Sequence, residues 1–437
     1  MVYPRIGWSR RAWLHALVLV ALLLPLGVAP CAPTPAPEAT PSPPTTLTIL
    51  LPVDWRPIVD EIAPQWKEET GVELEIISLA YDEVHDKIVS SAKGGADVDI
   101  VYVDTIWPAE FAKAGFLIPV DEYVTEEMRQ GIDKPLFEQL VWEGKLWAFP
   151  FNNQSKWLFY NKEILEKAGY DHAPSTWEEM EEMSRTMMEK GLVKYGTAWG
   201  WAQAEGLICD VTLLRYGFGG QWRSDEGKWV INDEAGQRML QWMVDSIGPD
   251  GWADPASTSL NDRTDLNPFL VGDTAFVLNW AFAWGLIQDP EESKVVDKVG
   301  IALIPASEES GLTSSSVTGG GGWGILANSD SPELAAKLLQ RLMSRDVQLQ
   351  ALDLQQNMPV WTEMYSDSTV LEAYSHFEAM GPQFQYAHFR PVLPWYSEWS
   401  LQAQVEIQAA LTNAKTPKQA LDDLTSWSNQ KSEEYGY

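Results

Sequence analysis

Residues Asp97–Tyr123, DVDIVYVDTIWPAEFAKAGFLIPVDEY, decide the fold of this chain because they join a buried strand, a sharp loop and a short helix. The run Asp99–Val103 is β-branched and aromatic, as in a strand covered on both faces of a parallel sheet. Asp104 follows at the carboxyl end of this strand, and Trp107 precedes Pro108, a residue tolerated in the first turn of a helix. Ligands of open α/β sheets bind beyond the carboxyl ends of strands, so this stretch predicts Asp104 and Trp107 as ligand contacts.

The segments on the amino-terminal side of this stretch alternate between strand and helix patterns. Residues 47–51 and 72–77 are typical of strands, whereas 58–69 and 81–92 carry the spacing of amphipathic helices. This alternation predicts an α/β fold with a parallel sheet and right-handed crossovers. With 437 residues, the chain is long enough for more than one domain, so we expect two lobes.

The first 46 residues have the composition of an export signal and a tether. Arginines precede the apolar run Ala16–Leu24, which is too short to span a bilayer comfortably, so we expect residues 1–30 to be a signal peptide. Residues 31–46 are rich in Pro and Thr and predict a semi-extended tether. Val28–Cys31 resembles the lipobox of bacterial lipoproteins, although a proline precedes the cysteine where a small residue is usual. Lipidation at Cys31 and ordinary cleavage are both compatible with this segment.

The charge and the rare residue types exclude several classes of function. The chain has 31 Lys and Arg against 62 Asp and Glu, and its net charge of −31 argues against nucleic acid or an anionic membrane surface as a partner. Cys31 and Cys209 are too few for a disulfide framework, and Cys209 lies in an apolar run typical of a buried thiol. The five histidines form no ligand spacing, so we expect neither a metal site nor a cofactor.

Residues Gly319–Gly324, GGGGWG, formally satisfy the glycine fingerprint of dinucleotide-binding sites. That fingerprint requires a helix amino terminus at the pyrophosphate, whereas these glycines lead into an apolar, strand-like run. Nucleotide binding is therefore rejected. Two interpretations remain, namely a flexible turn or a backbone that approaches a ligand with unpaired N–H and C=O groups.

The chain contains 22 Trp and 14 Tyr, most of which must serve packing. Tryptophans at strand ends or in polar loops are better candidates for ligand contact, and these are Trp55, Trp107, Trp280, Trp323 and Trp395. An indole face stacks on the C–H face of a sugar, while neighbouring carboxylates and amides bind its hydroxyl groups. The pattern therefore favours a carbohydrate ligand. For Trp107, which opens a helix, inward packing is an equal alternative.

Two other functions remain as alternatives. The 62 acidic residues are compatible with a glycoside hydrolase, which needs two carboxylates at a defined separation, but nothing in the sequence singles out a pair. The sequence contains no Walker A pattern, Gly-x-Ser-x-Gly elbow or His-Glu-x-x-His motif, so no catalytic residue is assigned. A surface adhesin that binds polysaccharide through its aromatics is the second alternative.

Several stretches together resemble the family 1 extracellular solute-binding proteins of ABC sugar importers, namely residues 97–123, 146–162, 319–325 and 342–360. The resemblance covers essentially all of residues 47–437 and preserves the order of the motifs. Gln203–Leu207 and the pair Gly219–Gly220 are most similar to the trehalose/maltose-binding branch of this family.

The resemblance implies a two-lobed periplasmic-binding-protein fold of type II, in which each lobe is a mostly parallel sheet flanked by helices. It assigns the first lobe to residues 47–151 and 299–330, and the second lobe to residues 152–298 and 331–437. The strands that join the lobes are expected near 148–152 and near Val299. A ligand would bind in the cleft between the lobes and close them by a hinge motion.

The resemblance also implies a set of ligand contacts. Sugar contacts of the family match the positions of Asp104, Trp280, Gly322, Trp323 and Arg390. Gln154 stands where the trehalose/maltose branch often has an aspartate, and an amide offers no charge-assisted bond, so the identity of the disaccharide stays open. Residues in the adjoining loops and motifs complete the expected set, and these are Asp54, Trp55, Trp107 and Glu205.

The implied function is that of a receptor that captures a sugar, a disaccharide such as trehalose or maltose, and delivers it to a membrane permease whose ATPase is a separate polypeptide. Such a protein is not an enzyme, and we expect a monomer. It would be exported to the periplasm or the extracellular face of the membrane and held there by a lipid on Cys31. A solute-binding protein for a non-sugar solute is a further alternative.

Overall fold

The computed structural model describes residues 46–95 and 97–437 of the chain. The expected signal peptide, nearly all of the expected tether and the candidate lipidation site Cys31 lie outside the described residues. Thr46, at the end of the expected tether, is the first residue of strand β1 (Thr46–Pro52). None of the helices within the described ranges is both long enough and apolar enough to cross a membrane.

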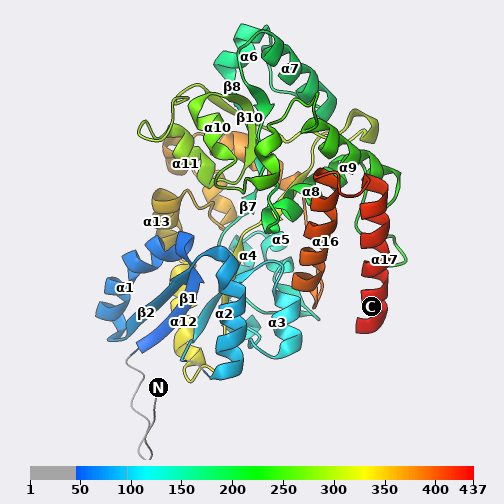
Figure 1. The fold of residues 1–437 in the computed structure, drawn as a ribbon. Helices are drawn as coiled ribbons and strands as arrows, with labels where there is room; N and C mark the ends of the chain where they lie inside the picture. Colours follow the sequence, from blue (N-terminus) through cyan, green and yellow to red (C-terminus); the bar gives the residue numbers. More distant parts are fainter. Residues whose placement is uncertain (1–45, 96) are drawn as a thin grey trace, which may run out of the picture. The chain divides into compact units, whose positions relative to one another are not determined.

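A five-stranded sheet with the order β2-β1-β3-β13-β6 organises the first lobe (Figure 1). Strand β1 runs parallel to β2 (Glu73–Leu79) and to β3 (Ile100–Asp104), as the alternation of strands and helices predicts. In contrast, β13 (Gly321–Ile325) runs antiparallel to β3 and to β6 (Phe149–Pro150). The stretch that decides the fold therefore lies at the centre of this sheet.

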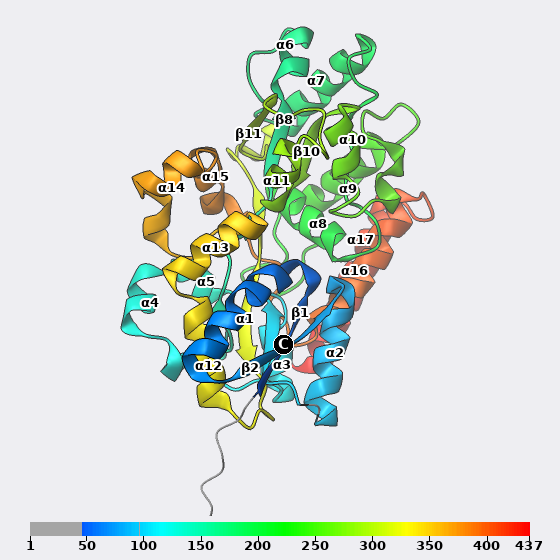
Figure 2. The ribbon, with the colours of Figure 1, turned by 90° about the vertical axis from the view of Figure 1, so that its left-hand side faces the viewer.

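The helices of the first lobe bury one apolar face. In α1 (Arg56–Thr70), the apolar residues Ile58, Ile62 and Trp66 recur at four-residue spacing and are all buried, as the pattern predicts. Helix α13 (Arg345–Gln355) lies beside α1, as Figure 2 shows. The other helices of this lobe are α2 (Tyr81–Gly94), α3 (Pro108–Ala114), α4 (Glu126–Gly131), α5 (Lys134–Glu138) and α12 (Pro332–Leu342).

A four-stranded sheet with the order β11-β8-β10-β9 organises the second lobe. Strand β8 (Trp157–Asn161) runs antiparallel to β10 (Thr274–Asn279) and to β11 (Val299–Ala302), whereas β9 (Tyr195–Thr197) is parallel to β10. The expectation of a mostly parallel sheet is therefore wrong for this lobe. The reason is that the chain enters the sheet through β8 and returns through β10 and β11 in the opposite direction.

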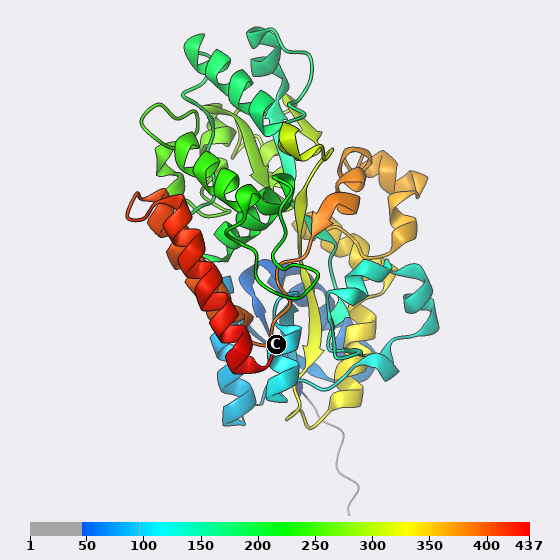
Figure 3. The same cartoon turned by 90° about the vertical axis from the view of Figure 1, so that its right-hand side faces the viewer.

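Helices surround the second sheet and extend to the carboxyl terminus. Helices α16 (Tyr396–Leu411) and α17 (Pro417–Tyr435) pack against each other and against α8 and α9 (Figure 3, red). The remaining helices of this part are α6 (Lys162–Ala168), α7 (Trp177–Glu189), α8 (Glu205–Gly217), α9 (Glu234–Ser246), α10 (Leu266–Val271), α11 (Phe282–Gln288), α14 (Ser368–Ala373) and α15 (Phe377–Met380).

A three-stranded sheet connects the two lobes. Strand β12 (Ser316–Gly319) pairs with β7 (Gln154–Ser155) on one side and with β14 (Ala387–His388) on the other. In the sequence, β7 lies between β6 and β8, and β12 directly precedes β13. The chain therefore crosses between the lobes at β7, again at β12, and a third time between α13 and α15, which contacts β11 of the second sheet.

The observed strand pairing differs from the expected division between the lobes. Val299 pairs with Asn161 of β8, so residues 299–302 belong to the second sheet, although the sequence division assigns them to the first lobe. Conversely, α12 and α13 contact β13 and α1 of the first lobe, although that division assigns residues 331–437 to the second. The return crossing consequently lies at β12 and not near Val299.

The glycine-rich run Gly319–Gly324 is mostly strand and not loop. Strand β12 ends at Gly319, strand β13 begins at Gly321, and Gly320 between them has a positive φ of 87°. Because residues 321–325 pair with β3, this part of the backbone is engaged in the sheet. The expectation that the run presents unpaired backbone groups is therefore wrong for most of its length.

Gly322→Ala is expected to lower the free energy of unfolding by about 1–3 kcal/mol. A Cβ at this position would lie 2.1 Å from the carbonyl oxygen of Phe149, which belongs to the neighbouring strand and cannot move without disturbing the sheet. Urea unfolding measures the change. Gly94→Ala is the matched control, because a Cβ there meets no heavy atom within 4 Å. Equal losses in both variants would contradict the prediction.

His376 is expected to make the stability depend on pH. The centre of its ring lies 5.2 Å from that of Trp284 and 5.1 Å from that of Phe377, and burial lowers the pKa of this imidazole to about 4. In the unfolded chain the pKa is near 6.5. The contribution of the neutral ring to the free energy of unfolding is therefore complete above pH 6.5 and is lost as the pH falls towards 4.

The measurement is urea unfolding of the wild type and of His376→Gln between pH 7 and pH 4. The free energy of unfolding of the wild type should fall more steeply with decreasing pH than that of the variant. His172→Gln, at a ring that is 56% exposed, should retain the steep fall. Parallel curves for the wild type and His376→Gln would show that this histidine does not carry the dependence.

Candidate ligand-binding site

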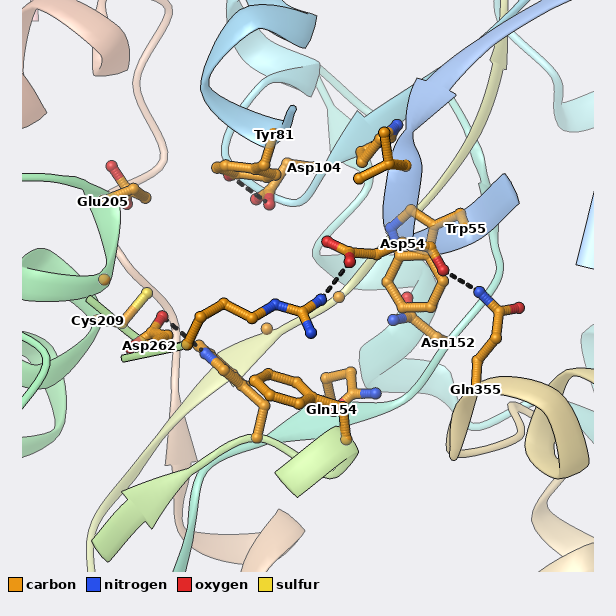
Figure 4. A pocket seen from close by; sticks show the side chains of 18 of the residues that line it. Asp54, Trp55, Tyr81, Asp104, Asn152, Gln154, Glu205, Cys209, Asp262 and Gln355 are labelled. Carbon is orange, nitrogen blue, oxygen red and sulfur yellow. Dashed lines mark hydrogen bonds and ion pairs between the residues drawn. The ribbon is translucent and has the colours of Figure 1, made fainter. Parts of the chain in front are cut away.

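A cavity of about 620 Å³ lies between the two lobes (Figure 4). Its volume falls within the range of about 300–1,000 Å³ that is usual for small-molecule sites. Both lobes and the connecting strands contribute to its walls. Its polar and aromatic lining includes Asp54, Trp55, Tyr81, Asp82, Tyr102, Asp104, Asn152, Gln154, Glu205, Asp262, Arg263, Trp280 and Arg390.

Arg390 links carboxylates from the two lobes. Its Nη2 donates to Oδ1 of Asp104 at 3.0 Å, and its Nη1 donates to Oε1 of Glu205 at 2.8 Å. Asp104 ends β3 in the first lobe and also accepts a hydrogen bond from the Tyr81 hydroxyl at 2.9 Å. The arginine is only 5% exposed, and burial alone would lower its pKa. The surrounding acidic groups outweigh that effect and raise the pKa of Arg390 above its usual range.

Glu205, at the start of α8 in the second lobe, is also held by α16. The hydroxyls of Tyr396 and Ser400 donate to its two carboxylate oxygens at 2.5 and 2.6 Å. Burial raises the pKa of Glu205, while Arg390 and the two hydroxyls act in the opposite direction. The arginine is therefore positioned from both lobes at once.

A buried lysine organises another wall of the cavity. Lys156 is fully buried, and its ammonium donates to Oδ1 of Asp210 at 2.6 Å and to Oδ1 of Asp262 at 2.8 Å. Oδ2 of Asp262 accepts a hydrogen bond from Nε1 of Trp280 at 2.9 Å. Gly319 leaves space for this indole, because a Cβ there would lie 2.3 Å from the ring. The carboxylate and the glycine together fix the orientation of Trp280.

An ion pair between Asp54 and Arg263 joins the lobes at an exposed part of the cavity (Figure 4). Asp54 lies in the short helix η1 (Val53–Trp55), and Arg263 lies in the loop before α10. The two side chains are 44% and 53% exposed, so solvent screens the pair and it stabilises the fold by about 0–1 kcal/mol. The amide of Gln355 donates to the backbone carbonyl of Asp54 and helps to hold the helix in place.

Aromatic rings form the wall on the side of the first lobe. Trp55 stacks on Tyr102 with ring centres 6.1 Å apart, and it packs against Phe151 in a T-shaped arrangement with ring centres 6.0 Å apart. Tyr81 stacks on Trp107 with ring centres 6.0 Å apart. Tyr81 therefore faces the cavity, and Trp107 lies behind it.

Some lining side chains carry a buried polar atom that finds no hydrogen-bond partner among the described residues. These atoms are Nδ2 of Asn152, Oε1 of Gln154 and Nε of Arg390. Asn152 is oriented through its Oδ1, which accepts from the backbone N–H of Gly321 at 2.8 Å. An unsatisfied buried polar atom costs about 1–3 kcal/mol, so a ligand-bound state in which these side chains turn and find partners would gain that free energy.

The cavity brings together most of the predicted contacts. Its lining includes Asp54, Trp55, Asp104, Gln154, Glu205, Trp280 and Arg390. These residues lie far apart in the sequence and converge where the connecting strands meet the two lobes.

The remaining predicted contacts lie outside the lining. Trp107 is 4% exposed and packs into the core, which agrees with the alternative of inward packing. Trp323 is fully buried in β13 between Tyr102 and Phe151. Gly322 is paired on both sides within the sheet. Trp395 is 3% exposed, packs against Trp229 and Trp427, and also lies outside the lining. We therefore do not retain these four residues as ligand contacts.

Several lining residues were not predicted from the sequence. Asn152 belongs to the polar stretch 152–156 between two apolar strands, and that contrast is a signal that could have indicated it. Asp262 and Arg263 lie in a loop without any pattern, and only their contacts with Lys156 and Asp54 place them at the cavity.

Cys209 is buried, as expected, and burial raises the pKa of its thiol above the usual range. It also lines the cavity. In the part of the chain that the structure describes, no group of three or more His, Cys, Asp or Glu side chains is placed to hold a metal ion.

The two-lobed fold and a cavity between the lobes define a binding protein, and comparisons with known proteins identify its family. The model of the bacterial extracellular solute-binding proteins matches residues 53–349, so the chain belongs to this family. A probable ABC transporter-binding protein of Deinococcus radiodurans is 26% identical over 376 residues, which cover 83% of this chain and 87% of the relative.

Solved structures agree with this assignment. The maltose-bound MalE3 of T. maritima is 29% identical and superposes with a TM-score of 0.81 over 87% of this chain and 98% of the other. An ABC transporter solute-binding protein of Thermotoga lettingae bound with α-D-tagatose shares the fold, with a TM-score of 0.79 and 23% identity over 88% of this chain and 99% of the other.

Asp262→Ala is expected to release the indole of Trp280 and to leave Lys156 with Asp210 as its remaining carboxylate partner. We expect a loss of about 1–3 kcal/mol in the free energy of unfolding, because buried polar groups lose a partner, together with a changed near-ultraviolet circular dichroism spectrum. Asp262→Asn keeps an acceptor for the indole and should restore most of the spectrum. Asp250→Ala, at an exposed position, is the control. An unaltered spectrum in Asp262→Ala would contradict the positioning role.

Proposed function

We propose that the protein captures a sugar in this cavity, a disaccharide such as maltose or trehalose, and delivers it to the membrane permease of an ABC importer whose ATPase is a separate polypeptide. The sugar lies between the lobes and draws them together by hinge motion about the connecting strands. In this proposal the first lobe comprises the five-stranded sheet with α12 and α13, and the second comprises the four-stranded sheet with its helices.

The observation that carries this proposal is the combination of unsatisfied polar atoms and aromatic faces in one cavity. Asn152, Gln154 and Arg390 line the cavity, and each carries a buried polar atom without a partner among the described residues. Trp55 and Trp280 line the same space. A saccharide has hydroxyl groups that donate and accept as well as apolar C–H faces, so it satisfies both kinds of surface at once.

The relatives support the same class of ligand. The T. maritima protein, at 29% identity, holds maltose, and the Deinococcus relative is described as a probable ABC transporter-binding protein. Our proposal includes export of the protein as a monomer and a lipid anchor at Cys31, which would keep the receptor close to its permease. Mass spectrometry of the mature amino terminus would test the anchor.

We propose binding without turnover. A glycoside hydrolase needs two carboxyl groups poised at the glycosidic bond, one as an acid and the other as a base or nucleophile. In this cavity the carboxylates of Asp104, Glu205 and Asp262 are each held by a buried cation. Such pairing suits a fixed binding surface better than proton transfer.

Isothermal titration calorimetry with maltose, trehalose and glucose, and with ribitol as a non-sugar comparison, tests the proposal. We expect the highest affinity for a disaccharide, and we expect Trp280→Ala to weaken that affinity by about tenfold, which corresponds to about 1.4 kcal/mol of lost stacking. Trp142→Ala, outside the cavity, should bind like the wild type.

Two results would refute parts of this proposal. Binding of ribitol or an amino acid without binding of any mono- or disaccharide would refute the sugar specificity and retain the solute-binding class. Recovery of a cleaved sugar after incubation with the purified protein would refute binding without turnover.

A further inference from the structure

We propose that this cavity selects by charge: it accepts saccharides that are uncharged or carry an ammonium group, and it excludes uronates and phosphorylated sugars. This inference rests on the proposed sugar-binding function and specifies which sugars the site takes. It follows from the excess of carboxylates over cations in the cavity lining, and from the ion pairs that the arginines and the buried lysine already form with carboxylates.

The cavity lining contains more carboxylates than cations. Figure 4 shows carboxylates from both lobes around one space, and the acidic lining residues are Asp54, Asp82, Asp104, Glu205 and Asp262. The basic lining residues are Arg263 and Arg390. An anionic group that enters this space therefore meets a negative potential, whereas an ammonium group meets a favourable one.

Both guanidinium groups are already engaged by carboxylates of the cavity itself. Arg390 spans Asp104 and Glu205 at 3.0 and 2.8 Å, and Arg263 is paired with Asp54. The Nε of Arg390 is buried and finds no partner among the described residues. Its positive charge, however, is compensated on both sides. Arg390 is therefore not left to bind a phosphate or a carboxylate in the two-pronged manner that such groups favour, because both of its terminal nitrogens already donate to carboxylates. An anion could pair with Arg263 only in competition with Asp54.

The cation behind the lining does not change this balance. Lys156 touches Asp262, but it also donates to Asp210 at 2.6 Å. Burial raises the pKa of Asp210 to about 6, so this carboxylate is ionised at pH 7.5 and compensates the lysine. On the first-lobe side, Asp82 is exposed and forms no ion pair within the described residues. Asp82 is therefore the lining carboxylate best placed to meet an ammonium group.

The experiment compares trehalose, trehalose 6-phosphate and 2-amino-2-deoxytrehalose by isothermal titration calorimetry at pH 7.5. At low salt, the phosphate ester should bind at least tenfold more weakly than trehalose, and the amino sugar should bind as tightly as trehalose or more tightly. Raising the NaCl concentration should narrow the gap between trehalose and its phosphate, because salt screens charge repulsion but leaves a steric clash unchanged. A gap that does not respond to salt would overturn the electrostatic inference.

A charge variant distinguishes electrostatic repulsion of the phosphate group from a steric clash with it. Asp54→Asn removes the partner of Arg263 and should improve binding of the phosphate ester relative to trehalose by about tenfold. Asp60→Asn makes the same change of net charge on α1, where Asp60 pairs with Arg56 outside the cavity, and should leave that ratio unaltered. Equal ratios in the two variants would overturn the inference.

The results for the inference and for the proposed function are distinguishable. If trehalose 6-phosphate binds the wild type within threefold of trehalose, charge selection is refuted and sugar binding stands. If neither maltose nor trehalose nor the amino sugar binds, the proposed sugar specificity itself is refuted, and the inference falls with it.

Discussion

The buried guanidinium of Arg390 lies between Asp104 of the first lobe and Glu205 of the second, and the other parts of the site are arranged around this contact. A charge removed from water is stable only where opposite charges and hydrogen bonds compensate for its lost hydration, and removal of one partner of such a pair costs about 3–5 kcal/mol. Hydroxyls from α2 and α16 hold the two carboxylates in turn. Arg390 thus couples the lobes at the cavity, in addition to the exposed ion pair between Asp54 and Arg263.

A second buried network fixes the orientation of an aromatic ring in the cavity wall. This network consists of Lys156 and the carboxylates of Asp210 and Asp262. Asp262 also accepts a hydrogen bond from the indole N–H of Trp280 and thereby holds the ring in place. An aromatic face is useful for recognition only when its plane is held, because a freely rotating indole loses entropy on binding. With most of the charged groups occupied by one another, the amides of Asn152 and Gln154 are among the polar groups left for a neutral ligand. The site therefore combines charged side chains that hold its shape with neutral amide and aromatic groups that can contact a ligand.

Much of the fold could be predicted because the relevant signals are local. The run that ends at Asp104 is apolar on both faces and forms the central strand, and the four-residue spacing from Ile58 to Trp66 marks the buried face of α1. The conformation of the glycine-rich run Gly319–Gly324 is not fixed by such local signals, because glycine is compatible with a turn and with a closely packed strand. The tertiary structure shows that the run forms a closely packed strand, because the backbone of Phe149 lies against Gly322.

For the site, the sequence by itself determined the residue types and several positions at strand ends, together with the resemblance that points to a binding protein. It could not determine which tryptophans face the ligand. Trp280 and Trp323 both lie at or beside strands with polar or glycine neighbours, but Trp280 reaches Asp262 while Trp323 is enclosed by Tyr102 and Phe151.

The direction of the strands in the second sheet, the return crossing at β12 and the pairing of Arg390 with Glu205 were likewise decided only by the tertiary structure. The physical reason is that each depends on contacts between segments far apart in the chain, whereas propensity and periodicity act over a few residues.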